Sequence, residues 1–386
     1  MRLGEIATFS KGKGISKSDI EENGVTECIR YGELYTYYNE TINDVKSKTN
    51  VDVKTLVLSE SNDIIVPASG ETMIDIATAS CVLKSGVALG GDLNIIKTKN
   101  NGVFLSYYLN SKKKLEIANL AQGISVVHLY STQLSTLFLN LPQLKEQARI
   151  SGFIKLLDKR IQTQNKIIGE LKTLKNTMIK KMFTQHFRFK KNKSEYFFEW
   201  EVKKLGDICI KAKSGGTPKS TIKEFYDGNI PFLSISDMTQ QGKYIWYTER
   251  AISEEGLYNS NSWIVPANSI IYSMYASIGF VSLNKIELAT SQAVLNLIPQ
   301  ATVNNEYLYY YLYYFREFID KYITTGTQGN LNAETVKNFD IMVPSFEEQI
   351  KITSFISSIE DKIEIEKQVL KAYEDQKQYL LQNLFI

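Results

Sequence analysis

Two long stretches of the chain repeat apolar residues at alternating steps of four and three. The apolar stripe runs from Ile150 to Met182 in the first stretch and from Ile352 to Leu384 in the second. Such steps keep one face of an α-helix apolar, which is typical of a coiled coil. Neither stretch contains proline after its first turn. Each therefore predicts a helix of about 40 residues, which is about 60 Å long.

Polar residues interrupt both stripes and predict how the helices pair. A parallel pair in register would set Lys175 beside Lys377, whereas an antiparallel pair can set Lys175 opposite Glu366 and Gln164 opposite Lys377. Because a polar pair fixes direction and register in such a seam, we expect an antiparallel coiled coil with a Lys175–Glu366 contact. Two separate amphipathic surface helices are the alternative. The expected interface residues are Leu157, Ile161, Gln164, Ile168, Leu171, Lys175, Ile359, Ile363, Glu366, Leu370, Tyr373 and Lys377.

The second stripe lies 202 residues after the first, and the same offset joins other segments. Leu3–Glu5 returns as Leu205–Asp207, and Phe183 returns as Phe385. The chain thus consists of two copies of one unit, and we expect pseudo-two-fold symmetry. A duplicated protein is suited to a two-part target or to two copies of a partner.

Ahead of each long helix, about 140 residues read as strands and loops. Short apolar runs predict strands near 64–67 and 270–272, and helical spacing predicts short helices at 103–119 and 305–321. Strands and helices do not alternate regularly, so the fold class is α+β. The first copy begins at Met1 without the lead-in of the second, so we expect its first strand to be short. The expected organisation is globular domains at 1–141 and 201–343, long helices at 142–185 and 344–386, and a linker at 186–200.

Composition narrows the class of protein. Hydrophobic residues make up 43% and charged residues 23%, which are values of a folded globular chain. The three cysteines are far apart, and no signal peptide or apolar run near eighteen residues is present. We therefore expect a reduced, soluble, cytoplasmic protein without a membrane segment. The net charge of +3 is too small to indicate a nucleic-acid partner by itself.

Catalytic motifs are poorly supported. The chain has only two histidines, His128 and His186, and neither lies near a cluster of cysteine or carboxylate residues. Gly215–Ser220 has proline where a phosphate-binding loop requires glycine before lysine. Asp52-Val53-Lys54 could suggest a nuclease, but such triplets arise often by chance. We expect no catalytic residue and no metal site.

A stiff spacer with a globular unit at each end is suited to a linear polymer that is read at two places, and duplex DNA fits this requirement. In each copy, a glycine-containing loop and the segment after it combine cations with aromatic and hydroxyl groups. Lysines in such places contact phosphates, whereas Arg, Ser and Thr are better suited to base edges. Solvated loops without a ligand are the alternative. The candidates are Lys11, Lys13, Lys17, Arg30, Tyr35, Thr36 and Tyr37 in the first copy, and Lys211, Lys213, Ser214, Thr217, Lys219, Lys243, Tyr247 and Arg250 in the second.

Two further loops, Gln122–Ser125 and Thr325–Asn330, contain glycine and small residues that allow close approach to a backbone. A phosphate contact and a tight turn are equally compatible with them.

Several short motifs recur in a fixed order along the chain. They are Ile29–Tyr35, Leu205-Gly206-Asp207-Ile208, Ser214–Pro218, Gly228–Leu233, and the pairs Leu141-Pro142…Glu146-Gln147 and Val343-Pro344…Glu348-Gln349 that open the long helices. In this order they resemble the specificity (S) subunits of type I restriction–modification enzymes, and the resemblance covers essentially the whole chain.

This resemblance implies a recognition subunit without catalysis of its own. Each globular unit would be a target recognition domain that reads one half of a split sequence in double-stranded DNA. The long helices would separate the domains and dock two modification (methyltransferase) subunits, and restriction (motor–nuclease) subunits would join them. S-adenosylmethionine, ATP and magnesium would be used by those partners. Because the loops of the two copies differ, we expect an asymmetric target.

Two other function classes stay open at this point. A nuclease with an unrecognised active site would cleave DNA with magnesium alone. A protein-only scaffold would show no salt-dependent DNA binding even with its partners.

Overall fold

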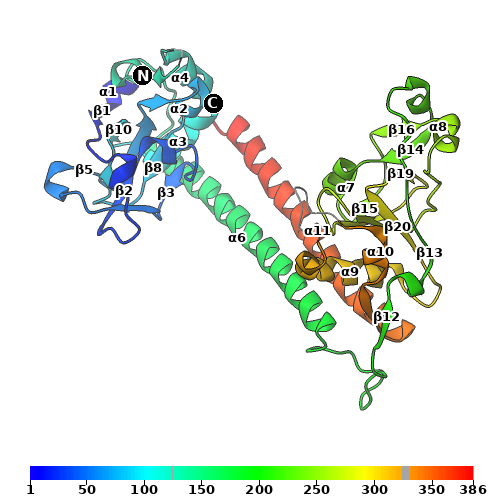
Figure 1. The fold of residues 1–386 in the computed structure, drawn as a ribbon. Coiled ribbons are helices and arrows are strands. Elements are labelled where there is room, and N and C mark those ends of the chain that lie inside the picture. Colours follow the sequence, from blue (N-terminus) through cyan, green and yellow to red (C-terminus); the bar gives the residue numbers. More distant parts are fainter. Residues whose placement is uncertain (124, 324–330, 386) are drawn as a thin grey trace. The chain divides into compact units, whose positions relative to one another are not determined.

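The computed structural model describes residues 1–123, 125–323 and 331–385. The chain divides into two compact units. Unit 1 comprises Met1–Ile167 and Glu366–Ile386, and unit 2 comprises Ile168–Ile365 (Figure 1). The loop expected at Thr325–Asn330 lies outside the described residues, as does Ile124 of the loop at Gln122–Ser125.

Unit 1 contains a five-stranded sheet, a four-stranded sheet and one strand pair. The five-stranded sheet has the order β1 (Ala7–Lys11), β10 (Leu93–Thr98), β6 (Asp63–Pro67), β8 (Ser80–Val82) and β3 (Thr41–Ile42). The four-stranded sheet has the order β4 (Ser47–Thr49), β2 (Thr26–Ile29), β9 (Ala88–Leu89) and β5 (Val57–Leu58). The pair consists of β11 (Val127–His128) and β7 (Ser69–Gly70).

Unit 2 repeats this plan. Its five-stranded sheet has the order β13 (Cys209–Ser214), β20 (Val294–Pro299), β17 (Ile270–Ser273), β18 (Val281–Asn284) and β15 (Tyr244–Ile245). A three-stranded sheet has the order β16 (Arg250–Ile252), β14 (Ile230–Leu233) and β19 (Ala289–Thr290). The remaining pair consists of β12 (Glu201–Lys204) and β21 (Asp340–Val343).

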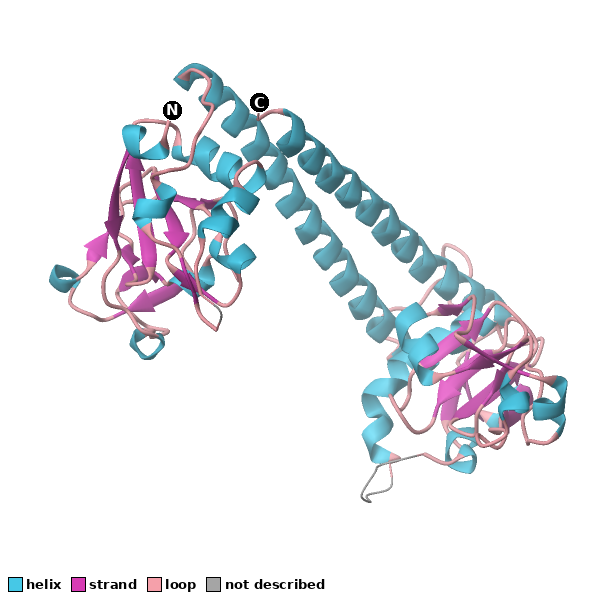
Figure 2. Ribbon diagram, turned by 90° about the horizontal axis from the view of Figure 1, so that it is seen from above, coloured by secondary structure: helices cyan, strands magenta, loops and turns pink. Residues whose placement is uncertain are grey.

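The two five-stranded sheets have the same topology. In each, the first four strands pair antiparallel and the last strand joins parallel to the fourth. In unit 1 the counterpart of the β12–β21 pair is a single bridge between Arg2 and Phe138. Figure 2 shows the strands of each unit gathered into sheets, with short helices around them. The α+β fold class is confirmed.

Among the described residues, five shorter α-helices lie in unit 1 and four in unit 2. Unit 1 has α1 (Leu3–Ile6), α2 (Met73–Ile76), α3 (Gly102–Ser111), α4 (Lys114–Leu120) and α5 (Ser131–Leu134). Unit 2 has α7 (Ile235–Gln241), α8 (Glu254–Tyr258), α9 (Asn305–Phe315) and α10 (Ala333–Lys337). The predicted helix at 103–119 is interrupted between α3 and α4, and the one at 305–321 continues from α9 as a 3-10 helix, Arg316–Lys321.

Equivalent hydrogen bonds begin α3 and α9 and tie each to a long helix. The side chains of Asn101 and Asn304 cap their helices by accepting from backbone N–H groups in the first turn. The backbone N–H of Asn101 donates to Gln147 (3.1 Å), and that of Asn304 donates to Gln349 (2.7 Å). Each long helix therefore starts against the cap of a short helix in its own unit.

The long helices are α6 (Leu144–Phe183) and α11 (Phe346–Asn383), and both pass through the two units. In unit 1, Lys377 Nζ lies 2.8 Å from Asp158 Oδ1, and Gln164 bonds Glu366. Partner numbers fall along α11 as they rise along α6, so the helices run antiparallel. In unit 2, Lys175 Nζ lies 3.1 Å from Glu360 Oε1, and the later Met182 shares one core with the earlier Ile352. The antiparallel direction is confirmed within each unit.

All twelve expected interface residues of α6 and α11 are buried or half-buried, but the expected register is wrong. Lys175 meets Glu360, six residues before the expected Glu366, and Gln164 meets Glu366 in place of Lys377. The physical reason is that the globular regions contribute to the seam. Glu40 binds Lys377 in unit 1, and Lys243 binds Glu360 in unit 2.

The end of each long helix completes a core. Phe183 at the end of α6 packs edge-on against Tyr307 and Tyr311 of α9 in unit 2. Phe385, 202 residues later, packs edge-on against Phe104 and Tyr108 of α3 in unit 1. Both phenylalanines are 2% exposed. Aromatic burial of this extent contributes strongly to stability.

Candidate nucleic-acid interface

A pocket of about 660 Å³ lies beyond the end of β1 in unit 1. A Cβ atom added to Gly12 would lie 1.9 Å from the carbonyl oxygen of Gly90. Only glycine allows the turn after β1 to lie this close to the backbone near β9. The pocket is lined by Gly14, Ile15, Ser16, Lys17, Asp19, Arg30, Tyr31, Gly90, Gly91 and Asp92.

Charged groups of both signs characterise the unit 1 pocket. Arg30 Nη2 lies 3.6 Å from Glu33, while Arg30 Nε is buried without a hydrogen-bond partner among the described residues. Arg30 therefore keeps a free donor. Hydrogen bonds from the side chain and backbone of Ser16 lower the pKa of Asp19, which is therefore an acceptor at neutral pH. The pocket offers a guanidinium donor, an exposed lysine and carboxylate acceptors.

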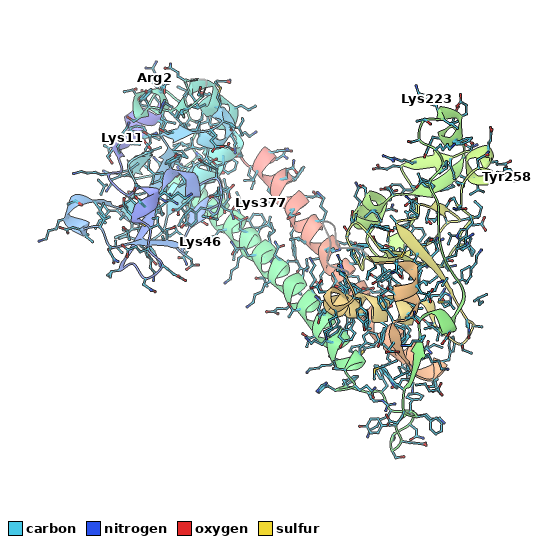
Figure 3. The ribbon with its side chains drawn as sticks, in the orientation of Figure 1. Arg2, Lys11, Lys46, Lys223, Tyr258 and Lys377 are labelled. Atoms are coloured by element: carbon cyan, nitrogen blue, oxygen red, sulfur yellow. The ribbon has the colours of Figure 1, made fainter. Side chains whose placement is uncertain are left out.

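A pocket of about 720 Å³ lies at the corresponding place in unit 2, beyond the end of β13. A Cβ atom on Gly215 would lie 1.8 Å from the carbonyl oxygen of Thr290, so the close turn recurs. Thr217 Oγ1 donates to Gln292 Oε1 at 2.7 Å, and Tyr258 is 90% exposed (Figure 3). The lining consists of Gly215, Gly216, Thr217, Tyr258, Asn259, Ser260, Asn261 and Gln292, all of them uncharged.

In unit 1 the structure brings two of the seven candidate residues together. Lys17 and Arg30 line the pocket, whereas the other five do not. Lys11 and Lys13 are exposed near the end of β1, and Lys11 lies over the ring of Tyr130 at 5.7 Å (Figure 3). The segment Tyr35–Tyr37 follows a 3-10 helix.

Within that segment, Tyr37 is exposed and has the ammonium of Lys46 4.8 Å from its ring centre. Thr36 donates to the carbonyl of Gly32, and burial raises the pKa of the half-buried Tyr35. Thr36 and Tyr37 are therefore exposed outside the pocket, whereas Tyr35 is half-buried beside them.

In unit 2 only Thr217 of the candidate residues lines the pocket. Ser214 accepts from Trp263 Nε1 through its carbonyl, and Lys211 Nζ lies 3.5 Å from the Trp263 ring centre. This cation–π contact holds Lys211 beside the end of β13. The candidates that are exposed elsewhere on the unit are Lys213, Lys219, Tyr247 and Arg250.

Lys243 does not have the role expected from the sequence. Its ammonium lies 2.6 Å from Glu306 and 3.0 Å from Glu360, and it donates to Tyr310 at 2.7 Å. Burial lowers the pKa of Lys243, but Glu306 and Glu360 outweigh that effect and hold it above its usual value. Two of its ammonium hydrogen bonds go to Tyr310 and Glu360, and Glu306 lies within ion-pair distance, so this environment favours a structural role for Lys243 over a phosphate contact.

Sequence reasoning missed most of the unit 2 pocket and part of the unit 1 pocket. The missed residues with polar side chains are Asp19, Asp92, Tyr258, Asn259, Ser260, Asn261 and Gln292. The run Tyr258–Asn261 carries no cation, and a search for basic loops passes over it. Its signal is a tyrosine followed by three consecutive hydrogen-bonding side chains.

Other chemistry has little support in the described part of the chain. No group of three or more His, Cys, Asp and Glu residues there is arranged to hold a metal ion. His128 Nδ1 lies 3.2 Å from Ser69 Oγ, and His186 lies beside Thr184. The cysteines are buried, and burial raises the pKa of Cys28 to about 11 and the pKa of Cys81 and of Cys209 to about 12. None of the described helices has both the length and the apolar character needed to cross a lipid bilayer.

Comparison with solved structures supports the fold. The whole chain superposes on an S subunit from M. genitalium with a TM-score of 0.60 and 17% identity, covering 95% of that chain. An HsdS subunit from Thermoanaerobacter tengcongensis gives a TM-score of 0.53 and 16% identity, covering 95% of that chain. A chain from a study of complex assembly and conformational transition in the type I R-M system gives 0.63 and 17%, covering 96% of that chain.

Sequence comparison identifies the family. The MjaIX specificity subunit of Methanocaldococcus jannaschii is 34% identical over 49% of this chain, which spans only 44% of that relative. The MjaVIII specificity subunit of the same organism is 25% identical over 99% of this chain and 90% of its own length. The model of the type I restriction modification DNA specificity domain matches residues 1–173 and again residues 198–374. The chain therefore belongs to the specificity subunits of type I restriction–modification enzymes, in which catalysis resides on other subunits.

Proposed function

We propose that this chain reads a bipartite, asymmetric sequence in double-stranded DNA, with unit 1 contacting one half and unit 2 the other. The observation that carries this proposal is the pair of unlike pockets at corresponding places on one duplicated frame. Both lie beyond a strand end where glycine lets two backbones approach closely. A common frame with different lining residues is what two different half-sites require.

The chemistry of the pockets suggests what each half-site contains. Arginine binds guanine O6 and N7, and aspartate accepts from the cytosine amino group. Arg30 and Asp19 therefore favour a G·C pair at unit 1. Asparagine and glutamine bind adenine N6 and N7. Asn259, Asn261 and Gln292 therefore favour an A·T pair at unit 2.

Exposed lysines near the pockets would supply the affinity that does not depend on sequence. Lys11, Lys13 and Lys17 in unit 1, and Lys213 and Lys219 in unit 2, are exposed. Contacts of this kind position a protein on phosphates and make binding dependent on salt.

The partner subunits complete the proposal. Two modification subunits would dock along α6 and α11, and restriction subunits would join them for cleavage. S-adenosylmethionine, ATP and magnesium would be used by those partners. The length of the helices would set the unread spacer, because each added residue extends a helix by about 1.5 Å.

The decisive experiment is sequencing of methylated DNA from cells with and without this chain. A two-part motif with adenine methylation that disappears without the chain is the expected result. Substitution of Asn261 by alanine should relax one half of the motif only, and substitution of Arg30 by alanine should relax the other. A wrong pair at one position typically costs about 1–3 kcal/mol. An unchanged methylation pattern without the chain would contradict the proposal.

A further inference from the structure

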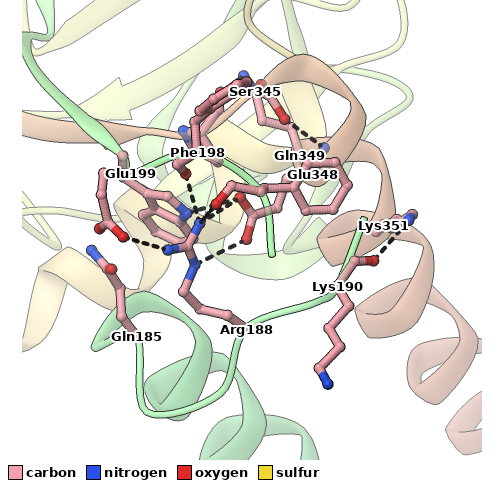
Figure 4. A network of polar contacts seen from close by, with 12 residues as sticks. Gln185, Arg188, Lys190, Phe198, Glu199, Ser345, Glu348, Gln349 and Lys351 are labelled. Atoms are coloured by element: carbon pink, nitrogen blue, oxygen red, sulfur yellow. Dashed lines mark hydrogen bonds and ion pairs between the residues drawn. The ribbon is translucent and has the colours of Figure 1, made fainter. Parts of the chain in front are cut away.

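The linker after α6 folds back over the first turns of α11 in unit 2 (Figure 4). Glu348 is fully buried and accepts from Arg188 Nη2 at 3.3 Å and from Trp200 Nε1 at 3.0 Å. Arg188 also donates to the carbonyls of Phe197 and Phe198. One arginine thus fastens the linker to the helix.

Aromatic side chains cover the next turns of α11. The ring of Phe355 lies 5.9 Å from that of Phe189 and 6.5 Å from that of Phe187. Lys351 donates to the carbonyl of Lys190 at 3.1 Å, and its ammonium lies 4.8 Å from the ring of Phe197. The linker therefore covers α11 in two ways: its arginine binds the buried glutamate of the helix, and its phenylalanines pack against Phe355.

The first turns of α6 carry the same residue types. Glu146, Arg149 and Phe153 stand 202 residues before Glu348, Lys351 and Phe355. The two helix starts are equivalent in structure as well, because Gln147 and Gln349 accept the same cap hydrogen bond.

On α6, however, these residues lie open. Phe153 is 50% exposed and Leu156 is 63% exposed. Glu146 and Arg149 are exposed, and neither has an ion-pair partner in the described part of the chain. At the position of Leu156 the second copy has Ser358, so the uncovered surface is the more apolar of the two. We call Glu146, Arg149, Phe153 and Leu156 the α6 face.

We propose that the α6 face binds a segment of a partner polypeptide with the chemistry of this chain's own linker, an arginine flanked by aromatic side chains. The arginine would pair with Glu146, and the aromatic rings would cover Phe153 and Leu156. Glu146 and the apolar side chains disfavour a phosphate backbone, so the occupant is a polypeptide and not DNA. This inference does not depend on the reading of DNA; only the identity of the partner as a modification subunit rests on the proposed function.

The linker itself provides the direct test. At the offset of 202, Met1 corresponds to Lys203. A second copy of residues 185–202 fused ahead of Met1 would therefore occupy the same position relative to α6 that the linker occupies relative to α11. Arg149→Cys supplies the probe, because Arg149 is exposed, whereas Lys351 at the same place on α11 is half-buried beneath the linker. The three native cysteines are buried, with a raised pKa, and react slowly with maleimide.

The fused segment should slow maleimide labelling of the introduced cysteine by about tenfold or more, which corresponds to about 1.4 kcal/mol of docking. The control segment carries Arg188→Glu, Phe187→Ser and Phe189→Ser and should leave labelling fast. Glu146→Arg should abolish the protection, and Arg188→Glu in the segment should restore it. Equal labelling with the native and control segments overturns the proposal.

A second experiment uses the chain assembled with its modification subunits. Labelling at the Arg149→Cys position should slow on assembly, and the fused segment should weaken assembly by competing for the α6 face. Undiminished assembly of the fused chain overturns the proposal. If the fused chain assembles less well but the residual complex still methylates the same motif, the α6 face is needed for assembly and not for the reading of DNA. The two proposals can therefore be told apart.

Discussion

In unit 1 an ammonium group lies between two carboxylates, whereas in unit 2 a carboxylate lies between two ammonium groups. Lys377 contacts Asp158 at 2.8 Å and Glu40 at 3.4 Å. Glu360 contacts Lys243 at 3.0 Å and Lys175 at 3.1 Å. In each unit a tyrosine of the short helix also donates to the α6 or α11 carboxylate, Tyr107 to Asp158 and Tyr310 to Glu360.

The difference depends on one position. Asp158 and Glu360 are 202 residues apart, as are Lys175 and Lys377, so both units inherited the same pair. Glu40 precedes β3 and Lys243 precedes β15, which is the last strand of each five-stranded sheet. The carboxylate of Glu40 in unit 1 binds the lysine of the inherited pair, whereas the ammonium of Lys243 in unit 2 binds the carboxylate of that pair. A duplicated frame can therefore diverge inside as well as at its binding loops, provided that each buried charge keeps a partner.

The largest expected effect comes from the matched phenylalanines. Phe183→Ala and Phe385→Ala should each destabilise the protein by about 3–5 kcal/mol, because each removes a buried ring from an aromatic core. Hydrogen exchange should report the loss in unit 2 for Phe183 and in unit 1 for Phe385. Phe346→Ala is the control, since Phe346 is 44% exposed. Equal loss of protection in both units for either variant would show that the units do not open separately.

Charge reversal at the divergent position should come next. Lys243→Glu sets a third carboxylate beside Glu306 and Glu360, and we expect a loss of about 3 kcal/mol, as for a broken buried pair. Glu40→Lys leaves Asp158 within reach of a new cation, as in unit 2, so the loss should be about 1 kcal/mol. Urea unfolding measures both. A larger loss of stability for Glu40→Lys would mean that unit 1 cannot adopt the charge arrangement of unit 2, in which a carboxylate lies between two ammonium groups.

The dependence of stability on pH should separate the two networks. Burial raises the pKa of Glu360, but Lys243 and the other donors outweigh it and hold it below the ordinary 4.5. Its contribution is present above pH 4.5 and is lost as pH falls through the lowered pKa. Burial lowers the pKa of Lys377, but Glu40 and Asp158 raise it above 10.5, so that contribution is lost only as pH rises through the raised value.

The stability gap between the wild type and Glu360→Gln should therefore narrow in acid. The gap between the wild type and Lys377→Met should narrow in alkali. Urea midpoints measured across pH for the three proteins test both expectations. A gap for Glu360→Gln that stays constant below pH 4.5 would argue against the ionic role of Glu360.

The smallest effect is expected for Lys175→Ala. Glu360 keeps Lys243 and Tyr310 as partners when Lys175 is removed, so the loss should be below about 1 kcal/mol. Urea unfolding beside Asp375→Ala, which removes an exposed pair with Lys371, gives the comparison. A loss well above that of Asp375→Ala would mean that the helix pair and not the globular region dominates the network.

Periodicity alone predicted much of the fold. Steps of four and three identified both long helices and twelve buried or half-buried positions along them, and the constant offset identified the duplication. The register could not be predicted in this way, because Glu40 and Lys243 enter the seam from distant parts of the chain. Polar residues in a seam indicate register only when they pair with one another.

The candidate site was predicted less well. Lys17 and Thr217 were found because a cation or a hydroxyl follows glycine there, and Arg30 was found because it begins a segment rich in tyrosine. Lys243 has the same local pattern, but its acceptors Glu306 and Glu360 are brought to it only by folding. Asn259, Asn261 and Gln292 carry no charge, so local sequence does not separate them from ordinary loop residues.

The placement of Phe385 in unit 1 also bears on how the protein is synthesised. A ribosome has joined the residues of unit 2 to the chain before it adds Phe385, which closes the aromatic core around Phe104 and Tyr108. The domain made first therefore matures last, and it stays exposed to chaperones and proteases until Phe385 has been added and has left the ribosome. A nonsense or frameshift mutation just ahead of the Phe385 codon would damage the amino-terminal domain and leave the carboxy-terminal one folded.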